Sequence, residues 1–354
     1  MSSNIAKDKY GFLSVYADEK PWHPEIGSIV VGAMTAEQVI KASRANGGVG
    51  LGFIVETQPA YAKVGGRFVE APSHRAIVRK DTREVFGFGS AEYKPIQNID
   101  ALRLPQAIVK TKQAGWISCG AIGNGAKLFA TLDLSKLGDI KIPGDPSKTK
   151  MLLSATWSHD ALEALRIGFS ARRIECANMR RMQLASWDGG ANLSVRIIHT
   201  GNVDDQMEEA RRVLGFATEL IADYTKLMTQ LAEIAVTPKW LSTEFLPKLI
   251  PTPPEMERPL ARTEAREAIA HLFAGSKTLV GVKPTAYRAL QAVDEYADHF
   301  RPMRTQDSQI AAERRMRTLL GDGPAADLKT LALKLMREEF ELAPVKVPVL
   351  ASRS

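Results

Sequence analysis

The chain has 354 residues, a formal net charge of +7 and a sequence pI of about 9.3. Hydrophobic residues make up 45% and charged residues 25%, the mixture of a globular protein that buries a core, in one large domain or two ordinary ones. No apolar run is long enough to span a bilayer, and the first residues lack the apolar stretch of a secretory signal, so we expect a cytoplasmic protein that does not bind membranes. Cys119 and Cys176 fit a reducing compartment and cannot form a disulfide framework.

Residues 1–30 show no lasting hydrophobic period, so we expect an N-terminal arm. Thr35 and Gln38 have the spacing of a capping box, in which the threonine side chain caps a helix and the glutamine side chain reaches back to it. A short helix is therefore predicted from this point through Ala42.

Several segments between the first helix and residue 200 have the composition and the period of β-strands. Gly65-Gly66 and Lys80–Arg83 lie between consecutive segments of this kind and predict tight turns. The predicted strands are Leu51–Glu56, Ala60–Val64, His74–Arg79, Glu84–Phe88, Trp116–Cys119, Lys127–Leu134, Met151–Ser158 and Ser194–Thr200.

The glycine-rich segment Gly120–Gly125 is the strongest catalytic signal, because such loops cradle phosphates. A P-loop, however, places its lysine directly after the last glycine and then begins a helix. Here Ala126 separates Gly125 from Lys127, and the lysine opens a strand pattern. Asn124-Gly125 is a typical hairpin signal, so we predict a hairpin turn without a bound nucleotide.

Helical patterns dominate after residue 160. Asn98 is expected to cap an earlier helix through Val109, in which Pro105 introduces a kink or a stop. The longest apolar stripe at helical spacing covers Asp204–Val236. The remaining predicted helices are Arg172–Ser186, Thr263–Ala274, Pro284–Phe300 (with Pro284 in its first turn), Asp307–Leu320 and Ala325–Glu339.

These elements predict an α+β protein, with an antiparallel β-sheet and packed helices followed by an all-helical C-terminal module. We expect an α+β core over residues 31–236, a proline-rich connection over 237–262, the helical module over 263–340 and a flexible tail over 341–354.

Residue types used in catalysis are present but scattered. No histidine has a histidine or cysteine partner at metal-ligand spacing, so we expect no metal site and no cofactor. Ser158, His159 and Asp160 are adjacent in sequence, whereas a catalytic triad requires convergence in space, so a turn is expected. Cys119 and Cys176 are interpreted as buried apolar residues. We therefore expect a protein that is not an enzyme.

Basic and aromatic residues provide a more specific pattern. Arginine binds phosphate in a bidentate manner, and aromatic rings stack on unpaired bases. Two arginine pairs recur on one side of the predicted helix Arg172–Ser186. The alternative is that all these charges form solvated faces with dispersed ion pairs. The candidate nucleic-acid-binding residues are Arg172, Arg173, Arg180, Arg181, Arg196, His199, Arg79, Lys80, Lys94, Tyr93 and Trp116.

Several short motifs, in a fixed order, resemble the phage/plasmid-like family called domain of unknown function 932. These motifs are Arg79–Thr82, Tyr93–Asn98, Arg173–Asn178, Arg196–Thr200 and Thr285–Tyr296. The resemblance implies a protein of a phage, plasmid or other mobile element. The order of strands and then helices is similar to that of the Red-beta and RecT type annealing proteins, which form rings or filaments along DNA.

From the charge and this resemblance we expect a protein that binds and anneals single-stranded DNA as a homo-oligomer, a ring or a filament. Two alternatives remain open. One is a metal-dependent nuclease or nucleotide-using enzyme built from dispersed acids such as Asp81, Asp133 and Asp160. The other is a non-catalytic interaction protein, for example a host-defence inhibitor, whose charge serves solubility.

Overall fold

The computed structural model of the chain describes residues 5–9, 11–17, 28–30, 35–44, 47–162, 165–173, 179–182, 203–252, 260–302 and 323–343. The predicted strand Ser194–Thr200, with Arg196 and His199, lies outside these residues, as does the predicted helix Asp307–Leu320. Cys176 and residues 344–354 of the expected tail also lie outside them.

The larger sheet has seven strands in the order β12-β11-β10-β9-β8-β3-β4, and every neighbouring pair is antiparallel except β3 with β4. The strands are β3 (Ser14–Ala17), β4 (Ser28–Val30), β8 (Gly115–Ile122), β9 (Lys127–Asp133), β10 (Thr149–Ser158), β11 (Arg166–Arg173) and β12 (Met179–Met182). All of Met151–Ala155 in β10 is buried. Successive side chains of a strand point to opposite faces, so both faces of the sheet are covered there.

Part of the expected N-terminal arm belongs to the folded core. The short strands β1 (Lys7–Asp8) and β2 (Gly11–Phe12) pair with each other, and β3 lies inside the large sheet between β8 and β4. Val15 and Tyr16 are buried. The expectation of an arm is therefore wrong for this part. The strand β3 pairs with β8, which is distant in sequence, so no local pattern reveals that β3 belongs to the sheet.

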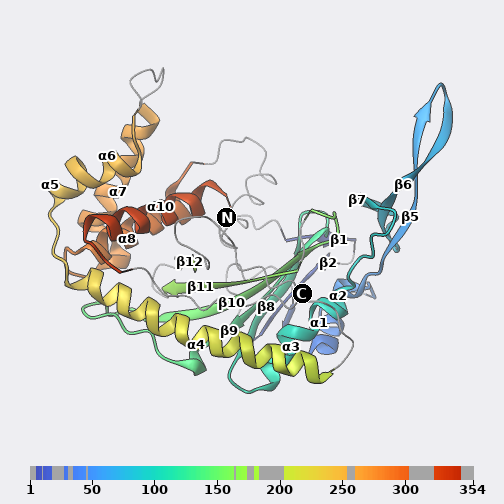
Figure 1. The fold of residues 1–354 in the computed structure, drawn as a ribbon, viewed down its shortest axis with the longest axis horizontal. Coiled ribbons are helices and arrows are strands. Elements are labelled where there is room, and N and C mark those ends of the chain that lie inside the picture. The colour runs from blue at the N-terminus through green and yellow to red at the C-terminus, as the bar shows by residue number, and fades with distance from the viewer. Residues whose placement is uncertain are drawn as a thin grey trace.

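The second sheet has the strand order β5-β6-β7, formed by β5 (Val55–Val64), β6 (Arg67–Arg79) and β7 (Glu84–Ser90). Gly65 and Gly66 form a two-residue turn with φ of 55° and 81°, which confirms the predicted turn. The predicted hairpin across Lys80–Arg83 is also confirmed, since Arg79 pairs with Glu84. The far end of the β5–β6 hairpin projects from the body of the molecule (Figure 1).

The capping box is confirmed at α1 (Ala36–Ala42), where Thr35 Oγ1 accepts from the Gln38 N–H and Gln38 Oε1 accepts from the Thr35 N–H. The predicted helix from Asn98 divides at Leu102 into α2 (Asn98–Ala101) and α3 (Arg103–Lys110). The interruption lies just before Pro105, whose ring cannot donate a helical hydrogen bond to the carbonyl of Ala101.

The predicted cap at Asn98 is wrong, because its side chain turns into the core. Asn98 Nδ2 donates to the carbonyl of Leu51 at 2.8 Å, and its Oδ1 accepts from Trp157 Nε1 at 3.1 Å.

The predicted helix Arg172–Ser186 is wrong over its described residues. Arg172 and Arg173 end strand β11, and Arg180 and Arg181 lie in the neighbouring strand β12. In the register of this pair Ala171 lies opposite Arg180 and Ser170 opposite Arg181. The free edge of β10 provides β11 with a partner for its backbone hydrogen bonds, and this tertiary pairing overrides the local helical spacing.

The long predicted helix is confirmed as α4 (Val203–Glu233), which runs along the large sheet (Figure 1). Its apolar stripe packs into the core, where the Phe216 ring lies 5.6 Å from that of Phe169 in β11. The proline-rich segment was expected to be a plain connection, but it contains α5 (Pro238–Trp240), a π-helical turn at Leu241–Phe245 and α6 (Leu246–Leu249). Proline is tolerated in the first turn of a helix, where its missing N–H has no partner to lose.

The C-terminal module is helical, as predicted, wherever the structure describes it. Pro284 precedes the N-cap Thr285 and does not stand in the first turn. The helices of the C-terminal module are α7 (Leu260–Gly275), α8 (Ala286–Glu295) and α10 (Pro324–Glu339). A π-helical turn at Tyr296–Phe300 continues α8. Short 3₁₀ turns lie at Gly50–Gly52, Ser135–Leu137 and Lys277–Leu279.

One continuous apolar cluster contains residues of the large sheet, of α4 and of the helical module, from Ala6 to Met336. Over the described ranges, none of the helices is both long enough and apolar enough to cross a membrane.

Candidate nucleic-acid interface

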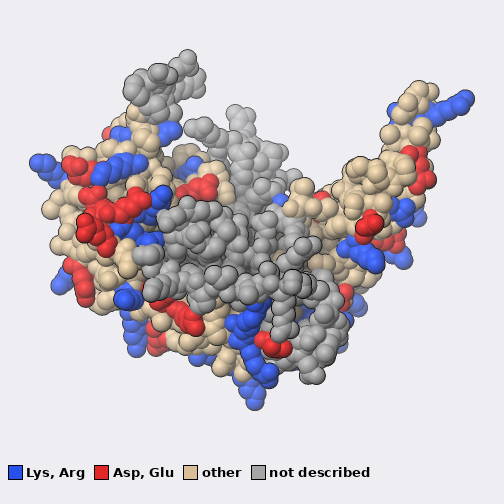
Figure 2. Space-filling model, in the orientation of Figure 1, with Lys and Arg blue, Asp and Glu red and all other residues tan. Residues whose placement is uncertain are grey.

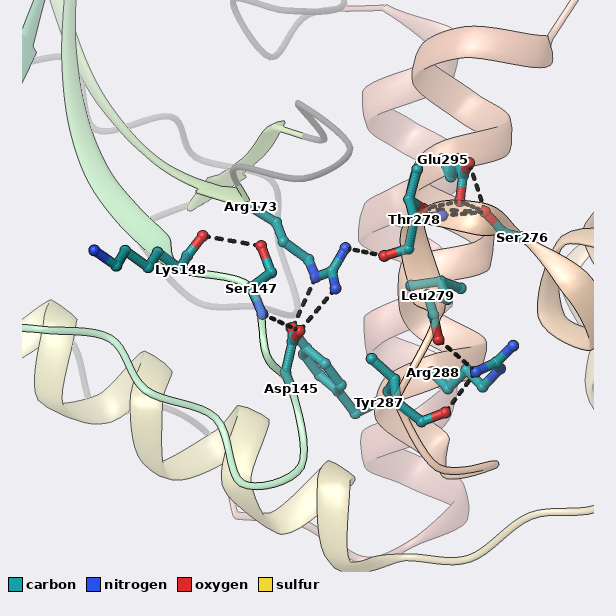
Figure 3. Close-up of polar contacts among 11 residues, drawn as sticks. Asp145, Ser147, Lys148, Arg173, Ser276, Thr278, Leu279, Tyr287, Arg288 and Glu295 are labelled. Atoms are coloured by element: carbon teal, nitrogen blue, oxygen red, sulfur yellow. Dashed lines mark hydrogen bonds and ion pairs between the residues drawn. The ribbon is translucent and has the colours of Figure 1, made fainter.

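Arg173, predicted to bind phosphate, is buried and holds the helical module against the sheet. Its side chain is 3% exposed. The guanidinium donates to both carboxylate oxygens of Asp145 at 2.7 Å and to the carbonyl of Thr278 at 2.7 Å (Figure 3). Tyr287 of α8 donates to the same carboxylate at 2.6 Å. These bonds direct the guanidinium inward, so the prediction of a phosphate contact at Arg173 is corrected.

The Asp145 carboxylate carries the charge that balances Arg173. Burial alone would raise the pKa of Asp145, but hydrogen bonds from Arg173, Tyr287 and the Ser147 backbone outweigh it and hold the pKa below its usual range. The pair is therefore ionised at neutral pH and joins strand β11, the loop after β9 and helix α8.

Arg79 is also buried, with its guanidinium bound inside the protein. It is 2% exposed, donates to both carboxylate oxygens of Asp81 at 2.8 Å, and lies 4.3 Å from the centroid of the Phe53 ring. A phosphate on the surface cannot reach a guanidinium that is enclosed in this way, so this candidate is corrected as well.

The two aromatic candidates differ in exposure. Trp116 is 6% exposed within β8 and has no free ring face for a base. Tyr93 is half-buried, and its ring packs on Gly89 of β7, where an added Cβ would lie 2.7 Å from the ring. Stacking on Trp116 is therefore corrected, whereas Tyr93 stays a prediction.

The remaining basic candidates fall into three groups. Lys80 and Lys94 are exposed at the second sheet, and Lys80 Nζ lies 3.7 Å from Glu56 Oε2. Arg172 is half-buried in β11. The side chains of Arg180 and Arg181 and the whole of Arg196 and His199 are outside the described residues, and their roles stay predictions.

The two sequence motifs that suggested catalysis form turns in the structure. Gly120–Gly125 ends β8 and forms the turn into β9, where the Gly125 N–H donates to the carbonyl of Ile122 at 3.0 Å, as predicted. Ser158 and Asp160 bond to each other in a turn after β10. No group of three or more His, Cys, Asp and Glu side chains within the described ranges could hold a metal ion. Cys119 is buried, as predicted, and burial raises the pKa of its thiol.

His159 belongs to a buried cluster at the junction of the two sheets. Its Nε2 donates to Asn98 Oδ1 at 2.8 Å in the neutral tautomer, and its ring stacks on Phe86 with centroids 6.0 Å apart. Burial lowers the pKa of His159 to about 4, against a smaller opposing effect of Asp160. The imidazole is therefore neutral at physiological pH and serves packing.

Sequence reasoning missed the end of the β5–β6 hairpin, residues 61–70, which we call the ribbon tip. All its residues are exposed, and Phe68 and Tyr61 expose 75% and 56% of their surface. The signal that could have found it is that apolar residues occupy both odd and even positions on each side of Gly65-Gly66, so neither face of the predicted hairpin is entirely polar.

The register of the ribbon tip assigns its side chains to two faces. Tyr61 lies opposite Glu70, and Lys63 lies opposite Phe68. These residues share one face because side chains alternate along a strand. Tyr61 and Phe68 are diagonal neighbours, about 7–8 Å apart in such pairs. The other face carries Val64 opposite Arg67, together with their apolar neighbours Ala62 and Val69.

Two sheets, a helical module packed on one of them and an exposed hairpin end with basic and aromatic side chains define an α+β protein. The chain belongs to the family described as a domain of unknown function (DUF932), whose model matches residues 85–320, about two thirds of the chain. The resemblance seen in the sequence motifs is thereby confirmed at the level of the family. No curated protein and no solved structure matches the chain.

Proposed function

We propose that the chain binds single-stranded DNA through the second sheet and its ribbon tip, and anneals complementary strands as a homo-oligomer encoded by a phage, plasmid or other mobile element. The observation that carries the proposal is the ribbon tip. A two-stranded ribbon is marginally stable alone in water, and this one exposes Tyr61, Val64, Phe68 and Val69 by more than half. Large exposed apolar side chains of this kind mark a binding surface.

The chemistry of the ribbon tip favours an unpaired nucleic-acid strand. Tyr61 and Phe68 offer rings for base stacking, and Lys63 stands opposite Phe68 on the same face. Arg67 on the other face adds a second cation, and basic side chains colour the projecting end in Figure 2. Aromatic platforms beside cations are the common feature of proteins that bind single strands without sequence preference.

Further cations lie toward the base of the sheet, among exposed acids such as Asp81 and Glu92. Lys80 and Lys94 are exposed there, and Phe88 of β7 exposes a further aromatic ring by 60%. A strand bound along this sheet would meet cations near the tip and near the base. Such phosphate contacts would position the strand without a base preference.

The extension from binding to annealing and assembly rests on analogy. The order of strands followed by helices is similar to that of Red-beta and RecT type annealing proteins, and likeness in fold does not determine function. Annealing requires no covalent chemistry, so it needs no catalytic group from this chain.

Stacking is tested by the double variant Tyr61→Ala, Phe68→Ala in fluorescence anisotropy with a labelled single strand of mixed sequence. The loss should be about 1–3 kcal/mol per base no longer stacked, with a nearly unchanged dependence on salt. Phe300→Ala is the matched control, since Phe300 is 56% exposed in the helical module. Equal binding by the ribbon double variant and by the parent protein would contradict the proposed interface.

The phosphate contacts are tested by Lys63→Ala, Arg67→Ala over a series of salt concentrations. Each lost contact should reduce the log–log slope of affinity against salt by about 0.7. Lys141→Ala is the control, because the side chain of Lys141 is 85% exposed on a different loop. A slope equal to that of the parent protein would show that these two residues do not meet phosphates.

A further inference from the structure

A pocket of about 460 Å³ lies at the base of the second sheet, between α1, the residues leading into β5 and the start of α2. This volume is within the range of about 300–1,000 Å³ that small-molecule sites occupy. Its lining residues are Glu37, Ile40, Lys41, Arg44, Gly52, Phe53, Ile54, Gln97, Asn98 and Ile99.

The charges at the rim favour an anionic ligand. Lys41 and Arg44 are exposed at the C-terminal end of α1, and neither forms an ion pair within the described part of the chain. Glu37, one turn earlier, is the acidic residue of the lining. A hydrogen bond from its own backbone N–H and one from Thr35 lower the pKa of Glu37, so its carboxylate is ionised and can accept from an amino group.

The floor of the pocket is apolar and held in place. Ile40, Phe53, Ile54 and Ile99 line it, and the Phe53 ring is fixed by the Arg79 guanidinium at 4.3 Å. The Gln97 and Asn98 amides form walls whose polar groups already bond to backbone atoms of Val55 and Leu51. Phe53 is 2% exposed and supports the floor from within the core, so the apolar surface open to a ligand comes from Ile54, which is 50% exposed, and from the half-buried Ile99.

Gly52 allows two lining residues to pack closely on the backbone. A Cβ at Gly52 would lie 2.8 Å from Ile40 Cγ2 and 3.4 Å from Arg44 Nη2. The absence of a side chain therefore lets the Arg44 guanidinium lie close to the backbone of Gly52 in the lining of the pocket.

The pocket lies at the start of the strand that leads to the ribbon tip. Its residues Phe53 and Ile54 lead directly into β5, and the N–H of Lys80 donates to the carbonyl of Ile54 at 2.9 Å. The ten residues of β5 extend about 30 Å at the usual rise of a strand, so the ribbon tip and the pocket lie near opposite ends of β5.

We propose that this pocket holds one nucleotide of the bound strand, with the base on the apolar floor and the phosphate between Lys41 and Arg44. This proposal rests on the proposed function, because it assigns a subsite on the same surface. Glu37 is placed to accept a hydrogen bond from an exocyclic amino group, so nucleotides with adenine or cytosine are expected to bind more tightly than those with thymine.

The experiment is calorimetry of the full-length protein with deoxyadenosine monophosphate, thymidine monophosphate and inorganic phosphate at millimolar concentration. The parent protein should bind the adenine nucleotide, and Lys41→Ala, Arg44→Ala should weaken this binding by about tenfold or more. Ile54→Asp should abolish it by placing an anion on the apolar floor, whereas the control Lys141→Ala should retain it. Ile54 is 50% exposed, so these changes leave the core intact.

Three outcomes would overturn the pocket assignment. The first is that the parent protein binds no nucleotide, and the second is nucleotide binding that the Lys41, Arg44 and Ile54 variants leave unchanged. The third is equally tight binding of inorganic phosphate, which would make this an anion site that does not recognise the base. In each case the oligonucleotide assay with the ribbon variants is a separate readout, so failure of the pocket is distinguishable from failure of DNA binding.

Discussion

Arg173 places its guanidinium between the Asp145 carboxylate and the carbonyl of Thr278, with both ionised side chains almost fully buried. Replacing Arg173 by Ala would leave a buried carboxylate without its cation. The expected loss in the free energy of unfolding is about 3–5 kcal/mol, whereas Tyr287→Phe, which removes one hydrogen bond to the same carboxylate, should cost about 1–3 kcal/mol. Urea denaturation measures both values, and a near-neutral Arg173→Ala would contradict the structural role.

The Asp145 carboxyl also makes a pH-dependent contribution to the stability of the fold. Because its folded pKa is depressed, the stability it adds is present above its ordinary pKa of 3.8 and is lost as pH falls through the folded pKa. This dependence should disappear in Asp145→Asn when stability is measured down to low pH.

The buried His159 should give the stability of the fold a second pH dependence, in a different pH range. Burial lowers its folded pKa to about 4 from an ordinary 6.5, so between these values the unfolded chain binds a proton that the folded chain does not. Stability should therefore decrease as pH falls from 6.5 toward 4 and level off below. In His159→Phe this part of the decrease should be absent. Replacement of the exposed His271 by Phe is the control, and an identical pH profile for all three proteins would refute the argument.

At the scale of elements, the ribbon tip is an appendage whose loss should separate folding from binding. All residues of 61–70 are exposed, so replacing them with a short glycine-containing turn removes little buried surface. We expect an unchanged melting temperature, measured by circular dichroism, together with weaker binding of single strands. A large drop in melting temperature would show that the hairpin end supports the fold.

Strand pairing within the large sheet explains why the helical prediction at Arg172–Ser186 was wrong over its described residues while that of α4 was right. The helix α4 carries its own signal, an apolar stripe that continues over many turns. The segment ending β11 has only two arginine pairs at a helical spacing, and a neighbouring strand offers stronger pairing. Short polar patterns therefore predict less than long apolar ones.

At the scale of the whole molecule, the continuous apolar cluster and the bonds of Asp145 predict that the large sheet and the helical module unfold together. Trp116 and Trp157 report on the sheet. Trp240 of α5 reports on the helical region after α4, where its ring stacks on Phe245 with centroids 5.3 Å apart and lies 5.5 Å from the ring of Phe340 at the end of α10. Tryptophan fluorescence and far-ultraviolet circular dichroism should give coincident urea transitions. Two separated transitions would show that the module is an independent domain.

Assembly is predicted on the same scale. With a net charge of +7, copies of the chain repel one another, and a bound strand neutralises them. Size-exclusion chromatography with light scattering should therefore show a larger assembly with a long oligonucleotide than without it. A mass that corresponds to one chain on every oligonucleotide would contradict a cooperative homo-oligomer.

The sequence by itself determined the features that depend on local chemistry. Thr35 and Gln38 predict the first helix, Gly65-Gly66 and Asn124-Gly125 predict their turns, and the apolar stripe predicts α4. Each signal lies within one segment, so neighbours along the chain carry all the necessary information. The family resemblance rests in the same way on short motifs read in order.

Only the tertiary structure decided which basic and aromatic residues are available to a ligand. Arg79, Arg173 and Trp116 have the chemistry of a nucleic-acid interface but are enclosed by segments distant in sequence, whereas Phe68 is exposed because its hairpin extends beyond the body. Burial depends on long-range packing of the whole chain, and a guanidinium forms the same hydrogen bonds with a carboxylate inside as with a phosphate outside. Residue type therefore predicts the kind of partner, and the fold selects where that partner can lie.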